Sequence, residues 1–359
     1  MKFKYILSII LTILLTIFLL ARCTSIKKNF LSSANSYDLN NNKSVNGISN
    51  DDSNESLSNN KENKELDNLD NPSTDDSKSQ DDSIPKAEPK LDKIIPAIDE
   101  VVGEYKDNIA LYYYNFDSAE SYCFNEDRYY LSASLRKIPL VMQVLDKVNA
   151  GELSLDTLVE YQEVDYAGGT GILQDEDYIG SRPIKELVEL SMTESDNIAF
   201  NMLNRLCGYT LIEYTNNLLG PNCMIEENGY IKLTAKHNFE IMYNLYTNPN
   251  NNPYYNMVIE ALKDTAFNDS INKYLPEGTV AHKIGSFYRS YHDSGIIFGD
   301  ETYILVILTR DVGTLSNSSE FTEEQEERIL VDWGKEAFEL IANVSKAIYD
   351  IVSSPNVGE

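Results

Sequence analysis

Cysteine and histidine are scarce in this chain, which has four of the first and three of the second among 359 residues. No two cysteines form a Cys-x-x-Cys pair, and His237, His282 and His292 do not fall at the spacings of metal ligands. The sequence therefore predicts neither a metal site nor a bound cofactor. Cys207 and Cys223 are more typical of buried free thiols, with a disulfide between them as the alternative.

Basic residues are also few, because 30 Lys and Arg stand against 57 Asp and Glu and give a formal net charge of −27. Recognition of nucleic-acid phosphates needs a basic surface, so this balance argues against nucleic-acid binding. The hydrophobic fraction of 42% is ordinary. The chain length suits one large domain or two small ones.

The N-terminus has the order of a secretory signal. Lys2 and Lys4 precede an apolar run over residues 5–21, whose length is at the lower limit for a membrane-spanning helix. The run ends in a sequence that resembles a bacterial lipobox up to Cys23, except that Arg22 stands where a small residue is usual. Two interpretations follow for residues 1–23, a lipoprotein lipidated at Cys23 or an uncleaved signal anchor. Either one predicts an extracytoplasmic protein anchored to the cell membrane. A cleaved signal peptide is a third interpretation, without a good small-x-small site to support it.

Composition divides the rest of the chain. Residues 24–90 are rich in Asn, Ser, Asp, Glu and Lys and almost lack aromatics, so they cannot bury enough apolar surface to offset chain entropy. We interpret them as a disordered acidic tether, with a binding tail for a basic partner as the alternative. A globular domain is expected over 91–353, followed by a tail over 354–359.

Hydrophobic periodicity predicts the elements of this domain. Helical patterns cover 91–105, 136–149, 184–206, 235–246 and 323–351, and strand patterns cover 109–114, 119–124, 280–283, 291–298 and 302–309. The order is helix, strands, a helical middle, strands and a helix. It predicts an α+β fold, in which an antiparallel sheet has flanking helices and an all-helical lobe is inserted.

Three short motifs carry candidate chemistry. In the first, Ser134 precedes Lys137 by three residues at the predicted start of a helix. Residues three apart share a helix face, so the hydroxyl and the amine can approach each other. A lysine whose pKa is lowered by burial or by a neighbouring cation can take the serine proton. Alone, the pair is equally typical of an N-cap beside an exposed lysine.

The second motif places Ser195 and Asn197 on either side of Asp196, about 60 residues downstream. A second hydroxyl can relay a proton to a leaving group. An amide can bind a substrate amide and orient the lysine. Alone, the same three residues are typical of a helix start with its N-cap.

The third motif is Lys283, Ile284, Gly285 and Ser286 at the end of a strand pattern. The lysine can hold a substrate carboxylate, and the glycine lets a substrate backbone approach the strand. The backbone N–H that follows can share an oxyanion hole with the N–H of Ser134.

In this order and spacing the three motifs resemble those of penicillin-binding proteins and class A β-lactamases. The resemblance extends over about residues 92–352, including a Gly-rich stretch at 168–171 and the residues 292–295. It implies a serine hydrolase that works through an acyl-enzyme. It implies that Ser134 is the nucleophile, Lys137 the base and Ser195 the proton relay. It also implies that Asn197 binds a substrate amide and that Lys283 binds the substrate carboxylate. Gly285 would be the strand glycine, and Ser286 would supply the oxyanion N–H.

Two departures from that pattern limit the prediction. Ile284 replaces a residue whose hydroxyl would also bind the substrate carboxylate, and this loss is expected to weaken binding by about 1–2 kcal/mol. Class A β-lactamases also carry a Glu-x-x-x-Asn stretch that activates the deacylating water. Glu226 and Glu227 lie in the matching interval, but neither is followed by Asn at that spacing, so surface carboxylates are the alternative interpretation.

Three functions therefore compete. The first is hydrolysis of β-lactams, and the second is a slow-deacylating, penicillin-sensitive peptidase or esterase that acts on peptidoglycan or a related acyl substrate. The third is a non-catalytic β-lactam sensor or wall-binding module, which the serine–lysine pair disfavours. The expected partners are a small-molecule substrate and the membrane, and we expect a monomer.

Overall fold

The computed structural model describes residues 89–313 and 323–354. The expected segments 1–23 and 24–90 lie outside the described residues except for 89 and 90, and so does Cys23. Within the described residues, no helix combines the length and the apolar character needed to cross a bilayer. Cys207 and Cys223 are buried free thiols, as the sequence favoured, and they form no disulfide.

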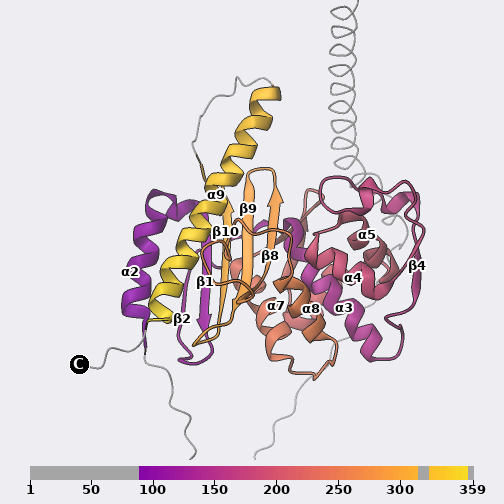
Figure 1. Ribbon diagram of the computed structural model, residues 1–359, viewed down its shortest axis with the longest axis horizontal. Coiled ribbons are helices and arrows are strands. Elements are labelled where there is room, and N and C mark those ends of the chain that lie inside the picture. The colour runs from indigo at the N-terminus through magenta and orange to yellow at the C-terminus, as the bar shows by residue number, and fades with distance from the viewer. Residues whose placement is uncertain (1–88, 314–322, 355–359) are drawn as a thin grey trace, which may run out of the picture.

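A five-stranded antiparallel sheet forms the centre of the molecule (Figure 1). The first hairpin along the chain, β1 and β2, lies at one edge, and β8 lies at the other. The spatial order is β2-β1-β10-β9-β8, formed by Ile109–Asn115 (β1), Ser121–Phe124 (β2), Val280–Phe287 (β8), Ser290–Ile297 (β9) and Tyr303–Arg310 (β10).

Helices cover both faces of this sheet. On one face the first and last helices of the described chain, α2 (Leu91–Val102) and α9 (Glu323–Val352), run beside each other (Figure 1). On the other face α7 (Ala235–Thr247) joins the sheet to a helical lobe. The lobe contains α3 (Lys137–Asn149), α4 (Ile184–Thr193), α5 (Asn197–Leu206), α6 (Leu211–Leu219) and α8 (Tyr255–Lys263).

Successive side chains of β10 point to opposite faces of the sheet, and both faces are apolar. Tyr303, Leu305 and Ile307 are buried against the α2 and α9 side, whereas Ile304 and Val306 are buried against the lobe side. A strand that is apolar on both faces requires a layer on each of them. The α+β architecture predicted from the sequence is therefore confirmed.

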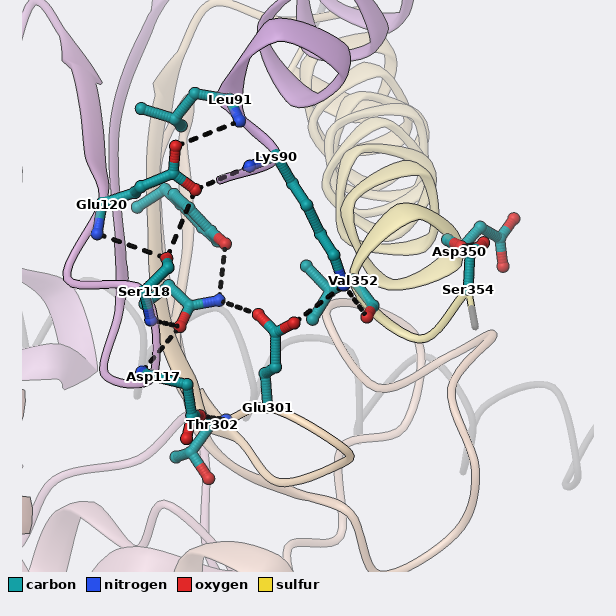
Figure 2. A network of polar contacts seen from close by, with 12 residues as sticks. Lys90, Leu91, Asp117, Ser118, Glu120, Glu301, Thr302, Asp350, Val352 and Ser354 are labelled. Atoms are coloured by element: carbon teal, nitrogen blue, oxygen red, sulfur yellow. Dashed lines mark hydrogen bonds and ion pairs between the residues drawn. The ribbon is translucent and has the colours of Figure 1, made fainter. Parts of the chain in front are cut away.

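A network of polar contacts surrounds Lys90 at the start of α2 (Figure 2). The amine of Lys90 donates to Glu301 at 2.8 Å and to the carbonyl of Val352 at 2.7 Å, and the Lys90 side chain is 10% exposed. Its backbone N–H donates to Glu120 at 2.8 Å. This network links the start of α2, the end of α9 and the sheet.

The structure differs from the sequence expectation in the helical middle. The pattern over 184–206 is two helices, α4 and α5, separated by a turn at Glu194–Asp196. Helices α6 and α8 were not predicted. Small sheets were not predicted either: β3 (Tyr130–Leu131) pairs with the hairpin of β6 (Met224–Glu227) and β7 (Tyr230–Leu233), and β4 (Leu158–Glu160) pairs with β5 (Ser181–Pro183).

Candidate active site

Ser134 lies in a tight 3-10 turn, Ala133–Arg136 (η3), immediately before α3. Ala133 has a φ of +44°, a conformation that costs an L-residue energy and that is often found at functional sites. The backbone N–H of Lys137 donates to the Ser134 carbonyl. The serine and the lysine therefore stand one turn apart, as the spacing predicts.

Lys137 is the side chain at which two of the motifs meet. Its amine donates to the Ser195 carbonyl, to the Ser195 hydroxyl at 3.2 Å and to the Asn197 carbonyl oxygen at 2.8 Å. The described residues show no hydrogen bond between this amine and the Ser134 hydroxyl. The side chain is 1% exposed, so every polar contact of the amine is made inside the protein.

Burial dominates the charge state of this lysine. Removal from water lowers the pKa of Lys137 well below the usual value, and the positive charges of Lys283 and Arg136 lower it further, against an opposing effect of Asp196. A dry site penalises the charged form of an amine, and nearby cations do the same. The environment thus favours a neutral amine.

The turn that carries Ser195 is strained and tightly held. Ser195 has a φ of +50°, which interrupts the helical run. Asp196 then caps α5, because its carboxylate accepts from the N–H groups of Ile198 and Ala199, both at 2.9 Å. The N-cap interpretation of this motif is therefore confirmed, and the same turn brings Ser195 and Asn197 to the Lys137 amine.

A loop between η4 (Glu163–Asp165) and η5 (Leu173–Asp175) supports that turn. The Thr170 hydroxyl donates to the Ser195 carbonyl at 2.7 Å, and the Thr170 carbonyl accepts from the Asn197 N–H at 3.1 Å. The Asn197 amide donates to the Gly168 carbonyl at 2.9 Å. Gly171 has a φ of +105°, and a Cβ there would lie 2.2 Å from Asp196 Oδ2, so only glycine fits.

Strand β8 forms the opposite wall. A Cβ on Gly285 would lie 3.3 Å from Ala133 Cβ and 3.2 Å from Leu135 Cγ, so the strand backbone packs closely against the Ser134 turn. Lys283 points toward the same lobe side and is completely buried. Its amine donates to the Ile284 carbonyl at 3.3 Å and stands 5.6 Å from the Phe267 ring. Burial lowers the pKa of Lys283 to about 7, although Asp293 acts in the opposite direction.

His292 on β9 links this strand to β3 and β10 through its two ring nitrogens. Its Nε2 donates to the Leu131 carbonyl of β3 at 2.7 Å, and its Nδ1 accepts from the Thr309 N–H of β10 at 3.1 Å. These partners fix a neutral tautomer. Complete burial lowers the pKa of His292 to about 4, against hydrogen bonds to the backbone that raise it. The strand that leads to Ser134 is thereby fixed to the sheet.

The candidate glutamates lie on the β6–β7 hairpin. Glu226 and Glu227 are both exposed, and Glu227 pairs with Lys232 on the adjacent strand. Tyr230 on the same hairpin lies 5.9 Å from the Phe287 ring, which follows Ser286 in β8. The hairpin therefore borders the β8 wall, while its two carboxylates are in water.

The structure brings most of the predicted residues together. Ser195 and Asn197 meet at the buried amine of Lys137, Ser134 lies one turn before that lysine, and Lys283, Gly285 and Ser286 lie on β8, which packs against the Ser134 turn. The supports at Thr170, Asp196 and His292 were not assigned by the sequence, which showed the Gly-rich stretch and the 292–295 stretch only as local features. The described residues contain no group of three or more His, Cys, Asp or Glu side chains that could hold a metal ion.

A sequence model of the beta-lactamase enzyme family matches residues 93–352, which are most of the chain. The chain therefore belongs to this family. A comparison with curated proteins finds no match.

Solved structures of two β-lactamases and of PBP-A have the same fold. A β-lactamase from Sphaerobacter thermophilus DSM 20745 is 20% identical with a TM-score of 0.62, and the match covers 74% of this chain and 100% of that one. PBP-A is 21% identical with a TM-score of 0.61, over 75% and 98%. The TLA-1 extended-spectrum β-lactamase is 20% identical with a TM-score of 0.62, over 74% and 100%.

Proposed function

We propose that this protein is a serine hydrolase that is acylated by β-lactams at Ser134 and then releases the product by hydrolysis. The observation that carries the proposal is the buried amine of Lys137, which lies between Ser195 and Asn197 with its pKa well lowered. A neutral amine one turn from a serine is the arrangement that activates a hydroxyl nucleophile.

The hydrogen bonds around Lys137 suit the neutral form. A neutral amine has two N–H groups, which donate to the carbonyl oxygens of Ser195 and Asn197, so in this form the Ser195 hydroxyl, 3.2 Å away, donates to the lone pair. In the proposed reaction this lone pair takes the Ser134 proton as the serine oxygen attacks the lactam carbonyl. The C–N bond then breaks, and the proton passes through the Ser195 hydroxyl to the leaving nitrogen.

The β8 wall supplies the remaining groups. The backbone N–H groups of Ser134 and Ser286 form the proposed oxyanion hole, and Lys283 binds the carboxylate of the substrate. Close packing of Gly285 on the Ser134 turn keeps the two N–H groups adjacent. One solved structure of a PBP-A variant, 21% identical to this chain, is an acyl-enzyme complex with penicillin G, and this supports the same chemistry here.

One observation favours a second candidate, a slow-deacylating penicillin-binding type that acts on peptidoglycan or a related acyl substrate. A deacylating base must hold a water against the acyl carbonyl in a shielded site. Glu226 and Glu227 are instead exposed on a hairpin with a two-residue turn. In that case the acyl-enzyme would persist.

We also propose an extracytoplasmic location with a tether to the cell membrane. The support is the order of Lys2, Lys4 and the apolar run over residues 5–21. Mass spectrometry of the membrane fraction tests the route, because lipidation predicts a modified Cys23 at the mature N-terminus and a signal anchor predicts an intact residue 1. Recovery of the whole protein outside the membrane fraction would contradict both routes.

A chromogenic cephalosporin separates the two candidate activities. The full chain is mixed with the cephalosporin, and the burst and the steady state are recorded. Continuous turnover supports the hydrolase, and a single stoichiometric burst supports the slow-deacylating type. Ser134→Ala should abolish both phases, whereas Ser354→Ala, at the far end of α9, should change neither. If turnover is continuous, Glu226→Gln and Glu227→Gln test the two glutamates. The variant that replaces the deacylating glutamate should show a burst in place of turnover, and the other variant should turn over normally.

A further inference from the structure

A hydrogen-bonded histidine and aspartate lie behind the β8 wall. His282 and Asp293 are completely buried on β8 and β9, and they point toward the α2 and α9 side of the sheet, away from Lys283. In the strand pairing Asp293 is opposite Ile284, and Lys283 is opposite Ser294. Asp293 is thus diagonal to Lys283 across a single layer of backbone.

The hydrogen bonds of the pair define its charge. His282 Nδ1 lies 3.0 and 2.9 Å from the two Asp293 oxygens, so it donates a proton to the carboxylate. His282 Nε2 is buried and has no hydrogen-bond partner. A second N–H at that position would be unsatisfied in a dry environment, which is costly, so this geometry favours the neutral imidazole. Asp293 also accepts from the N–H groups of Ile271 at 3.0 Å and Ser294 at 2.8 Å, and these bonds stabilise its negative charge.

Lys283 has no such partner of its own. Within residues 89–313 and 323–354 it forms no ion pair, and its amine contacts only the Ile284 carbonyl and the face of the Phe267 ring. A buried cation needs a compensating charge, and Coulomb attraction across a dry layer is strong enough to supply it.

We propose that Asp293 is a positioning residue, the buried counter-ion that keeps Lys283 charged without occupying its amine. His282 is the neutral anchor that fixes this carboxylate. Because the counter-ion lies behind the strand, the amine stays available for the anionic group of a substrate. An ion pair on the same side of the strand as the amine would instead have to break whenever a substrate bound.

The other charged groups near Lys283 do not replace Asp293. Lys137 on α3 can carry only a positive charge or none, so it cannot compensate Lys283, and Arg136 and Asp196 act on Lys137. His292, the neighbour of Asp293 on β9, is neutral above a pKa of about 4. Burial lowers the pKa of Lys283 to about 7, and the negative charge of Asp293 raises it.

The direct test is a pH titration of the Lys283 side chain by NMR in the full chain, with the signal assigned by Lys283→Arg. Asp293→Asn keeps the shape and removes the charge, and the pKa of Lys283 should fall by about one pH unit. Asp293→Ser serves the same comparison if the first variant does not fold. An unchanged Lys283 titration in a folded variant would overturn the proposal.

His282→Asn is the matched control, because its amide can still donate to Asp293. It should leave the Lys283 titration where it is. A rise of the Lys283 pKa by about one unit in His282→Asn would show that the imidazole carries a positive charge, and the assignment of the pair would then be wrong.

A second readout rests on the proposed function. At pH 7 the charged fraction of Lys283 falls from about one half to about one tenth in Asp293→Asn, so acylation by a fluorescent penicillin should slow about fivefold. Acylation by an activated ester without a carboxylate should not change. If the native protein is neither labelled at Ser134 nor able to turn over the penicillin, the proposed function fails while the NMR result still decides the role of Asp293.

Discussion

Gly171 offers the sharpest test of how the site is supported. Gly171→Ala would place a Cβ 2.2 Å from Asp196 Oδ2 and 2.4 Å from Asp196 Cα. The second contact is with the backbone, so rotation of the Asp196 side chain cannot relieve it. Either the loop or the start of α5 must move.

The cost can be worked out from the contacts at stake. A left-handed backbone conformation costs alanine about 1–2 kcal/mol. Displacement of Asp196 removes the cap of α5, worth about 1 kcal/mol, and the Thr170 bonds to Ser195 and Asn197 are worth about 1 kcal/mol each. We expect a loss of about 4 kcal/mol from the free energy of unfolding, a large part of the 5–15 kcal/mol that is typical of a domain.

Gly208→Ala is the matched control. Gly208 also has a positive φ, +70°, but a Cβ there meets nothing within 4 Å. This variant should lose only about 1 kcal/mol. Urea unfolding of both variants gives the difference, and the acylation rate reports on the site. If the two variants lose the same free energy and acylate equally fast, the close approach of the loop to Asp196 is wrong.

Three further predictions concern pH, binding and stability. Folding lowers the pKa of His292 to about 4, so the contribution of this histidine to stability is complete above the unfolded pKa of about 6.5 and is lost as pH falls. The free energy of unfolding at pH 5 should therefore be about 2 kcal/mol below that at pH 7. His292→Gln should remove this part of the pH dependence. Ile284→Thr supplies the hydroxyl that the resemblance to the family motif implies at this position and should strengthen non-covalent binding of a penicillin about tenfold, without strengthening binding of an ester that lacks a carboxylate. Lys90→Met removes the buried contacts with Glu301 and Val352 and should cost about 3 kcal/mol in urea unfolding while acylation stays constant; Lys106→Met, which breaks an exposed pair with Asp99, should cost less than about 1 kcal/mol.

The fold could be predicted from hydrophobic periodicity, because the apolar clusters on the two faces of the sheet are formed by regular helices and strands. The strand pattern at 302–309 became β10, and the helical pattern at 235–246 became α7. The break between α4 and α5 was not accessible, because it depends on the left-handed turn at Ser195, which is held by Thr170 and Lys137 from distant segments. The β6–β7 hairpin does have a local signal, since the Asn-Gly dipeptide at 228–229 is typical of a two-residue turn.

The candidate site shows the same division. Short motifs indicated Ser134, Lys137, Ser195 and Lys283, because the chemistry restricts residue type and spacing. The supports were hidden, because the role of Gly171 is fixed by a contact with Asp196, and that of His292 by partners on β3 and β10. No spacing along the chain reveals such contacts.

Peptide mapping by mass spectrometry can test whether Ser134 is the residue that a β-lactam acylates. The full chain is mixed with penicillin G, quenched with acid during the first turnover so that the acyl-enzyme is trapped before it hydrolyses, digested and searched for the added mass. We predict one penicilloyl group per chain, on Ser134, and none in Ser134→Ala. No adduct on the native protein, or an adduct that persists in Ser134→Ala, would contradict the account.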